Sequence, residues 1–505
     1  MNMTIDLHTH PQYKPFAHSY SAINQPGLPG SSSTLSSSLW HNDRPSIPDK
    51  LLNIFLSVTR FSQANFSASF QGRVMVQAMA LGCVEKFFFK NKLGTSDLAN
   101  LIDDFAAGFG RYRINTIEHM QDYWQDLLQE FQFVIKGQGQ VVKVDDTYVR
   151  YQIVRNYPEL NNYLTENKLP GAGATSQQPL TISIIPTIEG LHTLNSGLEQ
   201  PCNPDAVLNH AKLLKQFPFK PWWVTFCHHF YNELCGHARS LRQEIGKITN
   251  QEEGIESGFT ALGREVLHSL LDNSAHQRIL IDIKHMSAPA RREFLHRWKT
   301  DYQQSFPLIV SHGVANGLPT LGATQSLYPY LGDNFIVPLE RKKGGNGQLK
   351  DHNQINFFDD EIRAIVESQG ILGLQLDERR LANPEKIKTV KISLDRGKVR
   401  EYRSALVWQQ IQYMADMLDD HHLPAWDHLA IGSDYDGMVD PLNSFWTLED
   451  FPALRHYLLK HAEIYFTARK KFKLAANAIT PEELMQRIFS TNAQGFFQRW
   501  FSPLA

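Results

Sequence analysis

Two histidines and a glutamate in the N-terminal part of the chain have the residue types and spacing of metal ligands. His8 and His10 are two residues apart, and on a β-strand such a pair points to the same face, so both imidazoles can reach one ion. Glu189 ends an apolar run and is followed by Gly190. Its carboxylate can bridge two cations, and the glycine lets the chain turn sharply past it. This pattern predicts one part of a metal site.

Three more residues, all later in the chain, complete the pattern. His285, in Ile-Asp-Ile-Lys-His-Met-Ser, and His312, in Leu-Ile-Val-Ser-His-Gly, each close an apolar run. Neutral imidazole is the commonest ligand of zinc-like ions. Asp434, in Gly-Ser-Asp-Tyr-Asp-Gly, can bind an ion and also accept the proton that a metal-bound water loses. Asp436 is interpreted as structural.

The order of these residues is more informative than any one of them. A single histidine or carboxylate at a strand end is more often hydrogen-bonded within the fold. His-x-His, Glu, His, His and Asp at successive strand ends is the arrangement that a binuclear hydrolase requires. Two ions that share a bridging hydroxide provide a nucleophile at neutral pH and a Lewis acid for the scissile carbonyl.

Two adjacent histidines, His228 and His229, add a further candidate group. His229 is predicted to polarise a carbonyl and to stabilise the oxyanion that forms. Asn232, three residues on, is predicted to contact the substrate. Neighbouring residues on a strand face opposite sides, so one of the two histidines is expected to be structural. The sequence leaves open which one.

The elements that must position these residues are short apolar runs rich in β-branched side chains. They alternate with stretches of helical periodicity, such as residues 258–272, 359–369 and 402–419. Reactive residues at the carboxyl ends of eight such strands predict a (β/α)₈ barrel of the TIM type. The competing architecture is a doubly wound open sheet, which places its ligand at one switch point. The predicted strands are residues 4–8, 72–81, 180–189, 222–229, 279–285, 306–312, 370–376 and 428–434.

Residues 1–505 are predicted to form a single barrel domain, because the candidate ligands flank every extra segment. Insertions are expected at about 20–70 and 95–178, between the first and third strands, and at 340–355. The first contains the serine-rich residues 31–38, and the third is the Gly/Lys/Asn-rich stretch 342–353. The second is predicted to hold a long helix over 116–133 and a hairpin over 141–154.

Composition excludes several classes of partner. The chain has 50 basic and 52 acidic residues, so nothing favours a nucleic acid or another polyanion. The 4 cysteines form no C-x-x-C pair, which is typical of free thiols in a reducing compartment. The N-terminal residues lack the pattern of a signal peptide, and no stretch is long and apolar enough to span a membrane. We expect a cytoplasmic protein with a small-molecule substrate; a homo-oligomer stays open.

With these residues in place, the sequence resembles the membrane (renal) dipeptidase family of the amidohydrolase superfamily. The similarity is strongest over residues 258–287, where Gly-Phe-Thr-Ala-Leu-Gly runs on to Ile-Asp-Ile-Lys-His-Met-Ser. This matches the family block G-L-T-x-x-G…D-L-S-H-V-S. The resemblance covers most of residues 1–20 and 180–500. Further matching blocks lie at residues 188–190, 225–232, 310–312, 431–437 and 488–497.

The resemblance implies a (β/α)₈ barrel with two divalent ions, normally Zn²⁺, and hydrolysis of an amide or peptide bond of a small, dipeptide-like substrate. A metal-bridging hydroxide would be the nucleophile. Asp434 would take the proton of the bridging water and pass it to the leaving amine, and His229 would steady the tetrahedral intermediate. The implied metal ligands are His8 and His10 for one ion, His285 and His312 for the other, and Glu189 as the bridge.

The sequence departs from the family at two points. The family usually has an aspartate at the position of His10, which leaves metal identity and occupancy open. It also has an arginine after the position of His312 that binds the substrate carboxylate, whereas residues 313–331 contain no Arg or Lys. Arg341, Lys342 or Lys343 are the candidates to replace it. Hydrolysis of a lactone or phosphoester, or a non-catalytic barrel, are the alternative functions.

Overall fold

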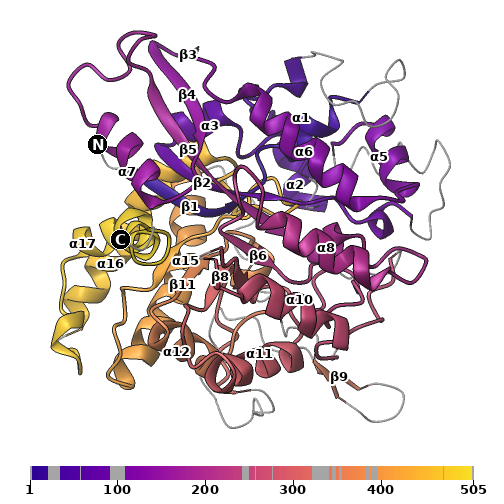
Figure 1. Cartoon of the computed structure of the whole chain (residues 1–505). Coiled ribbons are helices and arrows are strands. Elements are labelled where there is room, and N and C mark those ends of the chain that lie inside the picture. The colour runs from indigo at the N-terminus through magenta and orange to yellow at the C-terminus, as the bar shows by residue number, and fades with distance from the viewer. Residues whose placement is uncertain are drawn as a thin grey trace.

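Eight parallel strands close into a barrel in the computed structural model (Figure 1). Each strand pairs in parallel with the next, and the last pairs with the first through Asp6 and Ile431. The predicted (β/α)₈ barrel is therefore confirmed, and the open-sheet alternative is wrong. The barrel strands are β1 (Thr4–Thr9), β2 (Val74–Leu81), β5 (Leu180–Glu189), β6 (Trp223–Thr225), β7 (Leu280–Asp282), β8 (Ile309–Gly313), β11 (Ile371–Leu374) and β12 (Leu429–Ile431).

The structure describes most of the chain. The described residues are 3–20, 35–56, 59–90, 108–241, 249–255, 257–275, 277–320, 341–343, 349–351, 355–382, 387, 395–469 and 471–502. Within them, all four cysteines are unpaired, as predicted. No helix in this part of the chain has the length and apolarity needed to cross a membrane. The organisation of residues 1–505 as one domain stays a prediction.

The barrel strands are buried because helices cover their outer side. Every residue of β2 and β5 is buried, as expected for parallel strands that are covered on both faces. Helices follow the strands and surround the barrel (Figure 1). They include α8 (Pro204–Leu214), α10 (Ala261–Leu271), α11 (Ala288–Thr300), α12 (Asp359–Glu367), α15 (Arg396–Asp420), α16 (Phe451–Ala468), α17 (Pro481–Gln486) and α18 (Asn492–Trp500).

Capping residues decide where several helices begin. Thr260 accepts from the backbone N–H of Gly263 and starts α10. Ser287 caps α11 only two residues after His285, which fixes the turn that carries this histidine. Helix α15 begins earlier than the predicted range 402–419 because Asp395 caps it. Short helices at the strand ends include α1 (Tyr13–Ala17), the 3₁₀ turn η3 (Leu191–Leu194) and α13 (Glu378–Leu381).

The second insertion differs from its prediction in one respect. The single helix expected over 116–133 is wrong: α5 (Arg111–Glu118) ends early, and α6 (Tyr123–Gly137) starts afresh at its N-cap Asp122. The hairpin is confirmed as β3 (Val142–Val144) and β4 (Thr147–Ile153). Strand β4 also pairs in parallel with the first half of β5, so this hairpin extends the barrel sheet outwards. Helix α7 (Tyr157–Glu166) follows.

The other two insertions are described in part. The first contains a 3₁₀ turn over Leu35–Ser37, α2 (Ile47–Leu56) and α3 (Phe66–Gln71), while residues 31–34 of the serine-rich segment lie outside the described residues. The third holds a two-stranded antiparallel sheet, β9 (Arg341–Lys343) with β10 (Leu349–Asp351), instead of a loop throughout. The side chains of these two strands lie outside the described part.

Candidate metal centre

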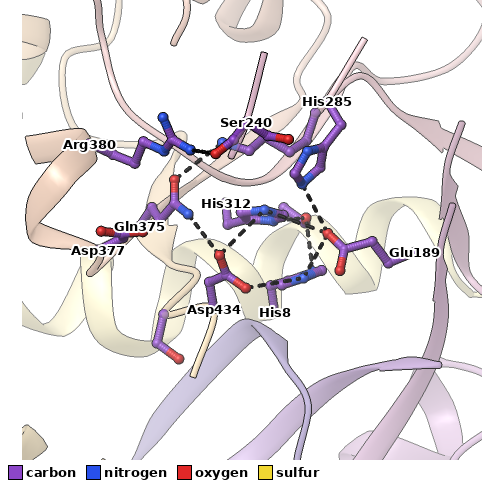
Figure 2. A network of polar contacts seen from close by, with 12 residues as sticks. His8, Glu189, Ser240, His285, His312, Gln375, Asp377, Arg380 and Asp434 are labelled. Carbon is purple, nitrogen blue, oxygen red and sulfur yellow. Dashed lines mark hydrogen bonds and ion pairs between the residues drawn. The ribbon is translucent and has the colours of Figure 1, made fainter. Parts of the chain in front are cut away.

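The carboxyl ends of the barrel strands bring all the predicted ligands together (Figure 2). They come from five strands that are far apart in the sequence, and each is buried. Parallel strands present their carboxyl ends at one face of a barrel, which is where functional residues of this fold gather. The ligands are His8 in β1, His10 just after it, Glu189 at the end of β5, His285 after β7, His312 in β8 and Asp434 after β12.

Glu189 lies at the centre of the cluster, with imidazoles on both sides of its carboxylate. Its Oε1 is 3.3 Å from His8 Nε2, 3.2 Å from His285 Nε2 and 3.7 Å from His312 Nε2. Its Oε2 is 3.2 Å from His10 Nε2. Oε2 is also 3.4 Å from His228 Nε2, so one carboxylate oxygen faces three imidazoles and the other faces two, as a bridge between two ions would.

Asp434 faces the same imidazoles from the opposite side. Its Oδ1 is 3.6 Å from His10 Nε2 and 3.9 Å from His8 Nε2, and its Oδ2 is 3.8 Å from His312 Nε2. Asp434 has a left-handed backbone with φ of 65°, which is unfavourable for a residue with a side chain. Gly437 passes so close that a Cβ there would overlap Asp434 Oδ1.

These distances suit ions of the zinc type. Two atoms that bind one zinc ion at about 2.0–2.2 Å in tetrahedral geometry lie roughly 3.3–3.6 Å apart. The potential ligand atoms here are 3.1–3.9 Å apart, and Glu189 Oε1 and His312 Nε2 have no hydrogen-bond partner among the described residues. The groups that could hold an ion are His8–His10–Asp434, His8–Glu189–His312 and Glu189–His228–His285.

Polar side chains behind the ligands hold the imidazole rings in place. Ser311 Oγ lies 3.1 Å from His8 Nδ1 and 2.9 Å from His312 Nδ1, so one hydroxyl fixes two rings with their Nε2 atoms towards the cluster. Asp6 Oδ1 accepts from the backbone N–H groups of His8 and Ser433, which ties β1 to β12 just below the site. Burial raises the pKa of Asp6 to about 6.

The electrostatics favour cations at the centre. Burial lowers the pKa of His285 to about 3, and burial together with His8 lowers the pKa of His312 well below its usual value. Both imidazoles are therefore neutral, as metal ligands must be. Burial also opposes a charge on His10, but the nearby carboxylates of Asp434 and Glu189 outweigh it and raise the pKa of His10 to about 10.

His228 and His229 correct the prediction that they face opposite sides. Strand β6 ends at Thr225, so the alternation of a strand does not apply to them, and both rings turn towards the cluster. Their ring centroids are 3.7 Å apart and lie 4.9 and 5.3 Å from that of His285. His228 Nε2 is 3.4 Å from Glu189 Oε2, and its Nδ1 is 3.0 Å from Glu85 Oε2.

The side chains of His229 and Asn232 differ in their hydrogen bonds. His229 Nδ1 lies 2.6 Å from Ser240 Oγ, and burial with the nearby His228 lowers the pKa of His229 well below its usual value. Asn232 donates to the carbonyl of Phe226 and accepts from two backbone N–H groups downstream. These bonds hold the turn that carries His229, and the substrate contact of Asn232 stays a prediction.

Several residues of the site escaped the sequence analysis. Glu85, four residues past the end of β2, and His228 belong to it. Lys284 Nζ donates to Gln375 Oε1 at 3.2 Å, and Gln375 Nε2 donates to Asp434 Oδ2 at 2.7 Å (Figure 2). Burial lowers the pKa of Lys284 to about 7. A lysine directly before a predicted ligand and a glutamine at the end of a predicted strand were the available signals.

Arg380, on α13, brings a positive charge to this side of the site. Its guanidinium donates to the carbonyl of Ser240 (Figure 2), and its charge contributes to the lowered pKa values of His229 and Lys284. Arg341, Lys342 and Lys343, predicted to replace the family arginine, form β9, whose side chains lie outside the described residues.

Comparison with known proteins gives structural neighbours only. No family model and no curated protein matches the sequence. A dipeptidase described as a metallopeptidase of family M19 is 14% identical with a TM-score of 0.47, covering 90% of this chain and 94% of that one. A metallopeptidase from Rhodobacter sphaeroides, liganded with a phosphinate mimic of the dipeptide L-Ala-D-Ala, is 14% identical with a TM-score of 0.49, covering 98% and 99%.

A third neighbour is the probable dipeptidase PvdM from Pseudomonas aeruginosa. It is 13% identical with a TM-score of 0.44, covering 87% of this chain and 89% of that one. The alignments with these structures extend over most of the chain. At this level of identity the likeness concerns the fold alone.

Proposed function

We propose that the chain is a metal-dependent hydrolase that cleaves the amide bond of a small, dipeptide-like substrate and uses two divalent ions, with zinc as the expected metal. The observation that carries this proposal is the position of Glu189, whose two carboxylate oxygens face different imidazoles. His8 and His10 would hold one ion, His285 and His312 the other, and Glu189 would bridge them. The bound ions would supply a Lewis acid and lower the pKa of water.

Asp434 is the proposed proton acceptor. Its carboxylate faces His8, His10 and His312 at distances too long for hydrogen bonds, so the space between them suits an ion with its attacking water. Asp434 would take the proton of that water and return it to the leaving amine. A positioned carboxylate of this kind contributes about 10²–10⁴-fold to a rate.

His229 is the proposed donor to the oxyanion, with His228 as a second donor beside it. The hydroxyl of Ser240 accepts from Gln251 Nε2 at 3.0 Å, so its own proton is available to His229 Nδ1. In that tautomer the Nε2 of a neutral His229 carries the proton and can donate to a carbonyl oxygen as it gains charge.

Arg380 is the residue that we propose binds a substrate carboxylate. A guanidinium pairs with carboxylates in bidentate geometry, and Arg380 already lies beside Ser240 at the edge of the site. Its positive charge also lies close enough to act on His229. An amide substrate with a free carboxylate, such as a dipeptide, fits a site that combines this cation with the metal cluster.

Metal content and a substrate panel test the proposal. We expect about two metal equivalents per chain by plasma mass spectrometry and turnover of dipeptides that ends on chelation. His285→Ala should lose metal and activity. His119→Ala should keep both, because His119 is exposed and lies just after the C-terminal end of α5. Full activity of metal-free protein would contradict the proposal.

The same panel separates the alternatives. N-acyl amino acids, lactones and phosphoesters should be poorer substrates than dipeptides. Turnover of lactones or phosphoesters alone would assign the barrel to a different bond, and metal binding without any turnover would favour a non-catalytic barrel. Cytoplasmic location and a homo-oligomeric state stay predictions.

A further inference from the structure

A buried hydrogen-bond chain runs from Lys284 through Gln375 to Asp434 (Figure 2 labels the last two). We propose that Gln375 and Lys284 are positioning residues that fix the orientation of the Asp434 carboxylate. This inference rests on the proposed function in one respect, the role of Asp434 as proton acceptor. Lys284 is fully buried, and Gln375 and Asp434 are 3% and 7% exposed, so little water competes for these bonds.

Lys284 and Asp434 together decide which way the Gln375 amide points. The Nζ of a lysine carries N–H donors in either protonation state, and an ionised carboxylate only accepts. The amide oxygen Oε1 therefore faces Lys284 Nζ at 3.2 Å, and the amide nitrogen Nε2 is left to face Asp434 Oδ2 at 2.7 Å. A flipped amide would place its N–H groups against the lysine and its oxygen against the carboxylate, which makes two unfavourable contacts in a buried place.

The amide in turn decides which oxygen of Asp434 faces which ligand. With Oδ2 held by Gln375, Oδ1 stays directed at His8 and His10, at 3.9 and 3.6 Å. Gly437 lies against Oδ1, so the carboxylate is confined from a second side. Rotation about the last side-chain bond would break the bond to Gln375 and bring Oδ1 away from the His8–His10 pair.

The neutral amide also separates the lysine from the carboxylate. The hydrogen bonds link Lys284 to Asp434 through Gln375, and the backbone N–H of Lys284 donates to Asp282 Oδ1 in β7. The lysine is thereby anchored on the strand that leads to His285. One chain of hydrogen-bonded side chains therefore links the ends of strands β7, β11 and β12. It fixes the position of Asp434 relative to His285, the neighbour of Lys284.

Variants of Gln375 with the same length test this proposal in the holoenzyme. Gln375→Met removes both hydrogen bonds, and Gln375→Glu keeps the shape and the acceptor for Lys284 but loses the donor to Asp434. We expect both to lower kcat by about 10–100-fold, as for other residues that orient a ligand, with KM within about two-fold and metal content unchanged. A packing role would spare Gln375→Glu, so wild-type kcat in that variant would overturn the proposal.

A double-mutant cycle tests the order of the chain. Lys284→Met removes one of the two contacts that orient the amide and should lower kcat less than Gln375→Met does. The double variant should be no slower than Gln375→Met, because the hydrogen bonds link the lysine to Asp434 through the glutamine. Multiplied effects in the double variant would show that the two residues act independently, and that result would also overturn the proposal.

A spectroscopic readout keeps this inference separate from the proposed function. Protein loaded with Co²⁺ should change its visible absorption spectrum on Gln375→Met at equal Co²⁺ stoichiometry, because the orientation of Asp434 beside the metal changes. If the wild-type protein binds Co²⁺ but hydrolyses nothing, the proposed function fails, and the spectral change still supports the positioning role. Identical spectra in the two proteins would overturn it.

Discussion

Asp434 and Asp436 are two residues apart after β12, yet they occupy two regions of opposite character. Both are buried and both have a left-handed backbone, with φ of 65° and 66°. Asp434 faces imidazole nitrogens at 3.6–3.9 Å. Asp436 is bonded directly: Lys14 Nζ donates to Oδ1 at 2.8 Å, and backbone N–H groups of Gln63 and Ala64 donate to Oδ2 at 2.9 and 2.8 Å.

The difference shows how a buried carboxylate is kept available for chemistry. Both oxygens of Asp436 have direct donors: Ser62 Oγ also donates to Oδ2 at 3.4 Å, and Lys14, which donates to Oδ1, donates as well to the carbonyl of Phe61. Asp436 thus ties the first insertion to the barrel, as its structural interpretation predicts. Around Asp434 the partners are imidazoles whose spacing leaves room for an ion, and its one short bond is to Gln375. We infer that the distance from a buried carboxylate to its neighbours, more than its burial or charge, distinguishes the candidate site from the scaffold.

Glu189→Gln should break the metal region most completely. An amide cannot bridge two cations as a carboxylate does, so we expect hydrolysis to fall to background and metal content to fall below one equivalent. Stability of the metal-free protein should fall, because the variant lacks a carboxylate that stabilises the charge on the buried His10. Activity, plasma mass spectrometry and thermal unfolding in chelator measure these effects. Wild-type metal content in the variant would contradict the bridging role.

Asp434→Asn should have the next largest effect, and on rate more than on metal. The four histidines and Glu189 remain, so we expect most of the metal to be kept. The amide cannot accept the proton of the attacking water, and kcat should fall by about 10²–10⁴-fold. The matched control is Asp436→Asn, the same substitution two residues further along the chain. A loss of less than about ten-fold for Asp434→Asn would contradict its role as proton acceptor.

Asp436→Asn should reverse this pattern and damage the scaffold. It leaves the buried Lys14 without its counter-charge, and breaking a buried pair in this way costs about 3–5 kcal/mol in the free energy of unfolding. We expect chemical denaturation to show that loss, with kcat per folded molecule within about ten-fold of the wild type. The double variant Lys14→Met/Asp436→Asn should recover part of the stability. A stable Asp436→Asn protein that has lost its activity would contradict the structural role of Asp436.

The sequence was sufficient for the barrel and for most of the cluster, for a physical reason. Buried parallel strands read as apolar runs, and the residues after them converge by topology, so Glu189, His285 and Asp434 could be placed without coordinates. The two-helix arrangement of α5 and α6 was missed because periodicity continues across the gap, and only the N-cap Asp122 marks the restart.

What the sequence could not supply was the direction of side chains beyond the strands. His228 was treated as a strand residue, and the early end of β6 invalidated that argument. Gln375 gains its role from two partners that are distant in sequence, Lys284 and Asp434, and no spacing in the chain predicts such a meeting. Long-range polar contacts of this kind depend on the packed barrel.

A third buried carboxylate, Glu130 on α6, should sharpen the comparison with the smallest effect. Its oxygens accept only from neutral groups, Gln12 Nε2 at 3.0 Å and the Gly82 N–H at 2.9 Å. Without a cation in direct contact, burial raises the pKa of Glu130 from 4.5 to about 8. The folded protein therefore keeps a proton that the unfolded chain releases, and this contribution to stability is lost as pH rises from about 5 towards 8.

Glu130→Gln removes the titrating group while keeping its shape. We expect the variant and the wild type to have similar melting temperatures near pH 5, where the folded wild type is neutral at this position. The variant should gain relative to the wild type as pH rises to 8, because the unfolded wild type releases a proton that the folded wild type keeps, whereas the variant does not titrate at this position. Parallel melting curves across this range would mean that neutral donors alone hold a buried charge as well as Lys14 holds Asp436.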